Sequence, residues 1–133
     1  RPDVRSTVHN LALALVRLGR YDEAERAVRR AIDLQSGGGA KDHLDMSEAQ
    51  NLLGYICLRQ GRIAEAERAL RLSIALTPYL TRPHYNLAVL LYQRGEQAEG
   101  DRELAFAERY GAPELAEAHR RFGSEAKARA APR

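Results

Sequence analysis

The stretch Leu18-Gly19-Arg20-Tyr21-Asp22-Glu23-Ala24 recurs twice along the chain, as Gln60-Gly61-Arg62-Ile63-Ala64-Glu65-Ala66 and as Arg94-Gly95-Glu96-Gln97-Ala98-Glu99-Gly100. Each copy lies between two segments whose apolar residues have helical spacing. The glycine of the first copy is 42 residues from that of the second, which is 34 residues from that of the third. Repetition at such a period is typical of a solenoid, in which each unit buries its apolar face against its neighbours.

The segments around each glycine have the periodicity of amphipathic helices. Val8, Leu11, Ala12 and Leu15 recur at i, i+3, i+4 and i+7 before Gly19. A glycine directly after such a segment favours the left-handed conformation that ends a helix. Small and large residues alternate at equivalent positions, which lets paired helices approach closely. The small positions are Ala12, Gly54 and Ala88, and the large ones are Val28, Leu70 and Leu104.

This pattern resembles the tetratricopeptide repeat. The first copy carries Asn10-Leu11-Ala12, Leu15, Gly19-Arg20-Tyr21, Glu23-Ala24, Val28 and Ala31; the second carries Leu53-Gly54, Gly61, Glu65-Ala66, Leu70 and Pro78; the third carries Asn86-Leu87-Ala88, Leu91, Gly95, Leu104 and Ala107. The resemblance implies an all-α fold, a right-handed helical-repeat solenoid of three helix pairs. The expected repeats span residues 5–38, 47–80 and 81–112.

The end of the chain predicts a cap for the last repeat. Leu115, Ala118 and Phe122 form the apolar stripe of a capping helix over residues 113–122, and such a helix covers the flank that a final helix pair leaves open. Residues 1–122 therefore form the expected repeat domain. Residues 123–133 lack a stripe and predict a C-terminal tail that is partly disordered or a frayed helix.

The longer first period is similar to the 42-residue repeat of kinesin light chains and their bacterial relatives. In that type a glycine and Asp-His-Pro-Asp precede a lengthened first helix. Here Gly39 precedes Asp42-His43-Leu44-Asp45, with Leu44 at the proline position, and the third repeat has the short form. Ser36-Gly37-Gly38-Gly39 predicts a flexible turn, because it lacks the Lys-Ser/Thr of a phosphate-binding P-loop.

The residue pattern gives no indication of catalysis, a metal or a cofactor. The four histidines are dispersed, and a single cysteine excludes an internal disulfide and a sequence-local zinc site. We expect Cys57 and His84 to pack in the core. Acidic residues fall on predicted solvent faces with i,i+4 partners, such as Glu25 with Arg29. We therefore predict a non-enzymatic protein.

The first helix of each pair lines the concave side of such a stack, and residues two, five, nine, twelve and thirteen places into a repeat point there. Tyrosine and arginine are prominent in this set and are enriched at binding hot spots, where truncation often costs ~2 kcal/mol or more. The alternative is that the tyrosines pack between helices with only their hydroxyls at the surface. The predicted peptide-binding groove comprises His9, Leu13, Arg17, Glu48, Asn51, Tyr55, Arg59, Arg82, Tyr85, Val89, Tyr92 and Gln93.

We expect this groove to bind an extended or helical segment of a partner protein with acidic and apolar side chains. A chaperone's C-terminal carboxylate is not the expected ligand. The family's clamp of Lys, Asn, Asn, Lys and Arg falls here on His9, Leu13, Leu52, Arg82 and Asn86, of which only Arg82 fits chemically.

Two other functions stay open as alternatives. The net charge of +3 and the groove aromatics allow a nucleic-acid-binding repeat, although scarce lysine and interspersed acids argue against it. The chain is otherwise an accessory interaction domain of a larger enzyme. Self-association through the exposed flank of the first helix, at Leu11, Leu15 and Leu18, is a further use of the surface.

The Ala- and Arg-rich composition is typical of a GC-rich bacterial genome. No apolar run approaches the roughly 20 residues that cross a bilayer. The compartment stays open. A cytoplasmic location is favoured, with the periplasm as the alternative because the chain begins at Arg1 and its N-terminus looks truncated.

Overall fold

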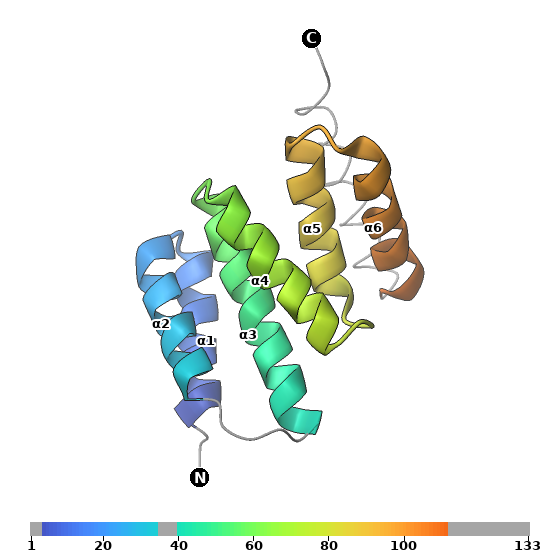
Figure 1. Cartoon of the computed structure of the whole chain (residues 1–133). Helices are drawn as coiled ribbons and strands as arrows, with labels where there is room; N and C mark the ends of the chain where they lie inside the picture. The colour runs from blue at the N-terminus through green and yellow to red at the C-terminus, as the bar shows by residue number, and fades with distance from the viewer. Residues whose placement is uncertain (1–3, 35–39, 112–133) are drawn as a thin grey trace. The chain divides into compact units, whose positions relative to one another are not determined.

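The computed structural model describes residues 4–34 and 40–111. Within these ranges the chain forms helices and no strand (Figure 1). Consecutive helices contact each other as pairs, α1 with α2, α3 with α4 and α5 with α6. The predicted all-α helical repeat is therefore confirmed. The helices are α1 (Val4–Arg17), α2 (Tyr21–Asp33), α3 (Ala40–Arg59), α4 (Ile63–Leu76), α5 (Thr81–Gln93) and α6 (Gln97–Tyr110).

The helices fall into two compact units. Unit 1 spans Arg1–Thr77 and contains α1 to α4, and unit 2 spans Pro78–Arg133 and contains α5 and α6. In unit 1, α3 contacts α1 and α2 as well as α4, so that the first two helix pairs stack side by side (Figure 1). The predicted repeat boundaries stay predictions.

Each pair is closed by the same turn, which the repeated heptapeptide builds. Gly19, Gly61 and Gly95 have φ of 75°, 78° and 80°, the left-handed region that costs glycine nothing. In the first turn the Gly19 amide donates to the Val16 carbonyl at 2.9 Å and the Arg20 amide to the Leu15 carbonyl at 2.9 Å. These two bonds define a Schellman motif, and the other two turns repeat it.

The core of unit 1 depends on a close approach of α3 to α4 at Gly54. A Cβ atom on this glycine would lie 2.6 Å from Leu70 Cγ, a distance that real Cβ contacts do not reach. Leu70, Ile56 and Cys57 are fully buried around this crossing. The prediction that small residues permit close packing is confirmed here, and so is the core position of Cys57.

Buried hydroxyls also join α3 to the end of α4. Ser47 Oγ donates to the Ser73 carbonyl at 2.9 Å, and Ser73 Oγ donates to the Ser47 carbonyl at 2.7 Å. The Thr77 hydroxyl is hydrogen-bonded to Ser47. Both serines are fully buried, so these bonds satisfy polar groups that would otherwise be costly inside the core.

In unit 2 the core is built around Tyr92. This side chain is 1% exposed, and its hydroxyl donates to Asp101 Oδ1 at 2.7 Å. Its ring lies against Gly100, where a Cβ would be 2.7 Å from Tyr92 Cε1. The glycine that makes the third repeat irregular therefore makes room for this ring. Tyr92 is a core residue, where the sequence predicted a groove residue.

The segment that is similar to kinesin light chains lies inside a helix. α3 has 20 residues, against 14 in α1 and 13 in α5, and Asp42-His43-Leu44-Asp45 forms part of its first turns instead of preceding it. Leu44 keeps the backbone N–H that a proline would remove from the helix. The expected turn at 36–39, the capping helix at 113–122 and the tail lie outside the described residues.

Among the helices that the structure describes, none combines the length and apolar character that a membrane crossing requires.

Candidate binding surfaces

The first candidate surface is a stripe along α3 of unit 1. Glu48, Asn51, Tyr55 and Arg59 follow one another at i, i+3, i+7 and i+11, which places them on one face of the helix. All four are exposed or half-buried, whereas the residues between them, Leu52, Leu53, Ile56 and Cys57, are buried. We call these four residues the α3 stripe.

The predicted groove residues of α1 are also accessible. His9 and Leu13 are half-buried and Arg17 is exposed, and α1 contacts α3. The predicted apolar flank is only partly free, because Leu15 is buried in the core. Leu11 and Leu18 are 54% and 68% exposed.

The C-terminal end of the α3 stripe contacts a tyrosine from α2. Arg59 Nε donates to the Tyr21 hydroxyl at 3.2 Å, and the guanidinium carbon lies 5.8 Å from the centroid of the Tyr21 ring. Tyr55 interacts electrostatically with both residues. Burial raises the pKa of Tyr55, and the neighbouring Tyr21 adds to this rise while the Arg59 charge opposes it. We call Tyr21, Tyr55 and Arg59 the Tyr–Arg cluster.

Tyr21 is the residue that the groove prediction missed. It belongs to the repeated heptapeptide and begins α2, the second helix of its pair, whereas the predicted groove residues all come from first helices. One signal was available, since the aromatic ring stands where the other two copies have Ile63 and Gln97. The distance in sequence to Tyr55 and Arg59 hid the contact, because periodicity does not say which turn of one pair faces which helix of the next.

The second candidate surface lies on α5 of unit 2, at the same offsets as the α3 stripe. Arg82 and Gln93 are exposed, and Tyr85 and Val89 are half-buried. Val89 packs against the buried pair Ala88 and Tyr92. Arg82, Tyr85 and Gln93 thus supply the accessible polar surface of this stripe.

His84, on the buried side of α5, ties unit 2 together. Its Nδ1 lies 2.6 Å from Glu103 Oε2 and its Nε2 lies 2.8 Å from the Pro78 carbonyl, while its ring stacks on Phe106 with centroids 3.9 Å apart. Two acceptors require a proton on each ring nitrogen, which only the imidazolium form supplies. Burial lowers the pKa of His84, but the bonds to Glu103 and to Pro78 outweigh it and raise the pKa above its ordinary value. His84 therefore packs as a bridging cation, in line with the expectation that it packs in the core.

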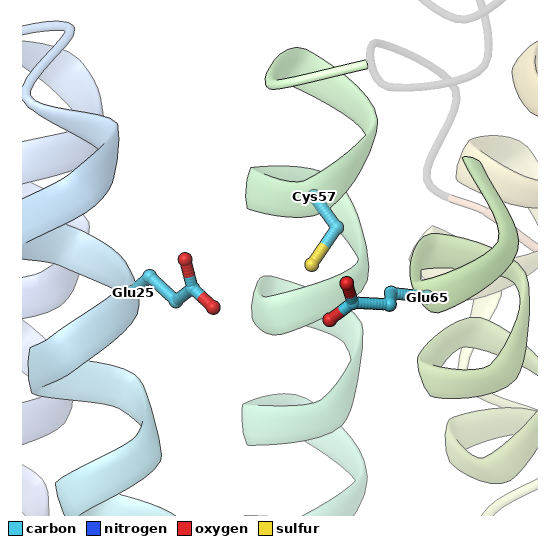
Figure 2. A group of neighbouring side chains, drawn as sticks. All are labelled: Glu25, Cys57 and Glu65. Carbon is cyan, nitrogen blue, oxygen red and sulfur yellow. The ribbon is translucent and has the colours of Figure 1, made fainter. Parts of the chain in front are cut away.

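A third group of chemically active side chains lies where α2, α3 and α4 of unit 1 meet. Figure 2 shows the Cys57 sulfur between the carboxylates of Glu25 and Glu65. One ligand-type atom from each residue lies within 4.8 Å of the others, a composition that would suit a metal ion. The surrounding charges decide what this group does.

Arginine already occupies both carboxylates. Arg62 Nη1 lies 2.6 Å from Glu25 Oε1 and Arg62 Nη2 lies 2.5 Å from Glu65 Oε2, and Arg29 Nε contacts Glu25 at 3.0 Å. Burial raises the pKa of Glu25, but its bonds to Arg62 and Arg29 outweigh this and lower the pKa below its usual value. Burial also raises the pKa of the Cys57 thiol, which favours the protonated form. The group therefore serves as an ion-pair network between α2 and α4, and the expected pair of Glu25 with Arg29 is confirmed.

Comparison with known proteins fits this architecture. One family model described as tetratricopeptide repeat matches residues 3–78, and a second with the same description matches residues 81–105. Neither names a subtype, so the likeness to kinesin light chains stays a prediction. No curated protein matches the chain.

A solved structure with a similar fold is that of SycD, the type III secretion translocator chaperone of Yersinia enterocolitica, in a form described as an alternative dimer. It aligns with a TM-score of 0.77 and 23% sequence identity, over 98% of this chain and 93% of that chain. At this identity the likeness extends to the fold alone.

Proposed function

Because the chain belongs to the tetratricopeptide repeat family and is thus a protein–protein interaction module, we propose that it binds a segment of a partner protein on the accessible faces of its first helices, without catalysing a reaction. The observation that carries the proposal is the α3 stripe. Its polar residues reach solvent along a helix that also contacts α1, α2 and α4 within unit 1. Side chains that are accessible on a rigid element suit recognition better than those on a loop.

The chemistry of the stripe supports a protein ligand. Asn51 adds an amide side chain to the stripe, and Tyr55 and Arg59 are of the residue types that dominate interface energetics. Glu48 is the acid among them. A partner segment with acidic and apolar side chains would complement Arg59 and Arg17 on one hand and the half-buried Leu13 on the other.

The similar fold of SycD adds a precedent, since the name of that protein describes a chaperone for translocator proteins. The described form of SycD is a dimer, which makes self-association a use of the surface to test beside partner binding. Leu11 and Leu18 of α1 would serve it here. Sedimentation velocity at several concentrations, with Leu11→Glu/Leu18→Glu as the comparison, separates the two uses.

The proposal is tested by replacing Tyr55 and Arg59 together with alanine in the full chain and comparing the proteins captured from a lysate of the source organism. We expect at least one specific partner to be captured by the unaltered chain and lost with the double variant. The matched control is Arg68→Ala/Tyr79→Ala, the same change in composition at exposed residues that do not belong to the stripe. Capture that is equal for both variants, with equal helicity by circular dichroism, contradicts the proposal.

A further inference from the structure

An open pocket of about 350 Å³ adjoins the Tyr–Arg cluster in unit 1. It is walled by the turn between α1 and α2, the first turn of α2 and the end of α3. The lining residues are Gly19, Arg20, Tyr21, Asp22, Glu23, Arg59 and Gln60. The pocket therefore lies beside the C-terminal end of the α3 stripe and shares Arg59 with it.

The two arginines of this pocket differ in their hydrogen-bond partners. Arg20 binds Glu23 through Nε at 2.9 Å and Nη2 at 2.6 Å. Asp22 accepts a hydrogen bond from Gln60 Nε2 at 2.8 Å. Arg59 donates from Nε to the Tyr21 hydroxyl, and among the described residues no acceptor contacts its two terminal nitrogens. Asp22 and Glu23 thus have hydrogen-bond partners other than Arg59. The two terminal nitrogens of Arg59 can therefore bind a group from another molecule.

The Tyr–Arg cluster also limits the motion of this guanidinium. The Tyr21 hydroxyl fixes the Nε side, and the Tyr21 ring lies within cation–π distance of the guanidinium. An arginine that is already oriented loses less conformational entropy when it binds. Its two terminal nitrogens form a planar fork that matches the two oxygens of a carboxylate.

The charge of the pocket selects among anions. Its two arginines are balanced by its two acids, so the lining has no net charge. A singly charged carboxylate needs only the local fork of Arg59, whereas a phosphate with nearly two charges would meet Asp22 and Glu23 without a surplus of cations. The pocket therefore suits an aspartate or glutamate better than a phosphorylated residue.

We propose that Arg59 receives the carboxylate of an aspartate or glutamate side chain in the partner segment, in the pocket between the α1–α2 turn and the end of α3. This inference rests on the proposed binding role of the α3 stripe and names the chemistry that the stripe recognises at this end. Tyr21 also lines the pocket, and it acts as a positioning residue because its hydroxyl holds Arg59 Nε.

The test uses a displayed library of random 12-residue peptides, selected on the full chain and on Arg59→Gln and Arg59→Glu variants. We expect the unaltered chain to select peptides with an acidic residue at a constant position, Arg59→Gln to lose this preference, and Arg59→Glu to select a basic residue there. In a selected peptide, Glu→Gln should weaken binding about tenfold or more to the unaltered chain, the range of a charged hydrogen bond, and much less to Arg59→Gln.

Controls separate this inference from the proposed function. Arg68→Gln, at an exposed arginine of α4, should leave selection unchanged, and Tyr21→Phe should weaken the acidic preference several-fold while keeping the ring. Peptides that bind and depend on Tyr55 but show no acidic preference, or that keep it with Arg59→Gln, overturn the Arg59 assignment alone. A phosphoserine peptide that binds more tightly than its glutamate counterpart also overturns it. A library that yields no binder overturns the proposed function together with the assignment.

Discussion

Gly54 sets the distance between α3 and α4, and the first prediction concerns this residue. In Gly54→Ala the new Cβ would lie 2.6 Å and 2.7 Å from Leu70 Cγ and Cδ2, and Leu70 is fully buried and has little room to move. Overpacking of this kind costs about 1–3 kcal/mol. The higher helix propensity of alanine returns about 1 kcal/mol. We expect a net loss of about 1 kcal/mol and a Tm lower by several degrees, measured by circular dichroism.

A second substitution tests whether the loss comes from this contact. The first repeat places Ala12 and Val28 at the positions of Gly54 and Leu70. In Gly54→Ala/Leu70→Val the valine gives the methyl group room, so the pair should be less destabilised than the sum of the two single variants. Strictly additive changes in the free energy of unfolding would mean that the cost of Gly54→Ala does not come from its contact with Leu70.

Single residues were the scale at which sequence reasoning was most reliable, for a physical reason. Left-handed backbone at Gly19, Gly61 and Gly95 and close packing at Gly54 are local demands, and each leaves a glycine at a fixed place in the repeat. The burial of Tyr92 could not be predicted, because a residue at its helical position can be either exposed or buried. Gly100 decided for burial by leaving space on α6.

At the scale of elements, α5, α6 and the Pro78 carbonyl are held together by His84. Because the raised pKa of His84 belongs to the folded state, the stabilisation is complete below the unfolded value of about 6.5 and is lost as pH rises through the higher folded value. The groups that face the ring are Glu103, Pro78 and Phe106. We expect unit 2 to lose roughly 1.5–3 kcal/mol of stability, the worth of one charged hydrogen bond, when His84 loses a proton.

This pH dependence is measured by denaturant unfolding at intervals from about pH 5.5 to pH 9, and the His84 ring is followed by NMR. His84→Phe keeps an aromatic ring against Phe106 but does not titrate, so its stability should be flat where the unaltered chain declines. Glu103→Gln should lower the midpoint of the His84 titration. A pH profile shared by the unaltered chain and His84→Phe would show that the bridge does not depend on the charge.

The helices could be predicted from periodicity, whereas the contacts of each helix with its neighbours could not. The stripe of apolar residues identified the helices and the face that each buries, including the accessible α3 stripe. It could not identify the contact of Tyr21 with Arg59, because this depends on how the first turn of α2 meets the end of α3. It also could not foresee that Asp42-His43-Leu44-Asp45 continues into α3, since helix starts depend on capping more than on apolar spacing.

At the scale of the whole molecule, the last prediction concerns the alternative of nucleic-acid binding. The net charge is only +3, and in the described part several arginines are already paired with acids, including Arg20 with Glu23 and Arg71 with Glu67. Few cations are left to displace counterions from phosphates. We expect a single-stranded RNA of about 20 nucleotides to bind with a Kd above about 10 μM at about 150 mM salt, which is the range of non-specific binding. Fluorescence anisotropy measures this Kd.

A charge variant shows whether the ion pairs are the cause. Glu23→Gln/Glu67→Gln releases Arg20 and Arg71 from their partners and adds two positive charges, so RNA affinity should rise and fall more steeply with salt. Glu23 also lines the pocket beside Arg59, so an acidic peptide should bind at Arg59 at least as tightly in this variant as in the unaltered chain. Sub-micromolar RNA affinity in the unaltered chain, lost with Tyr55→Ala/Arg59→Ala, would instead assign the stripe to nucleic acid, with Tyr55 as a stacking surface for bases.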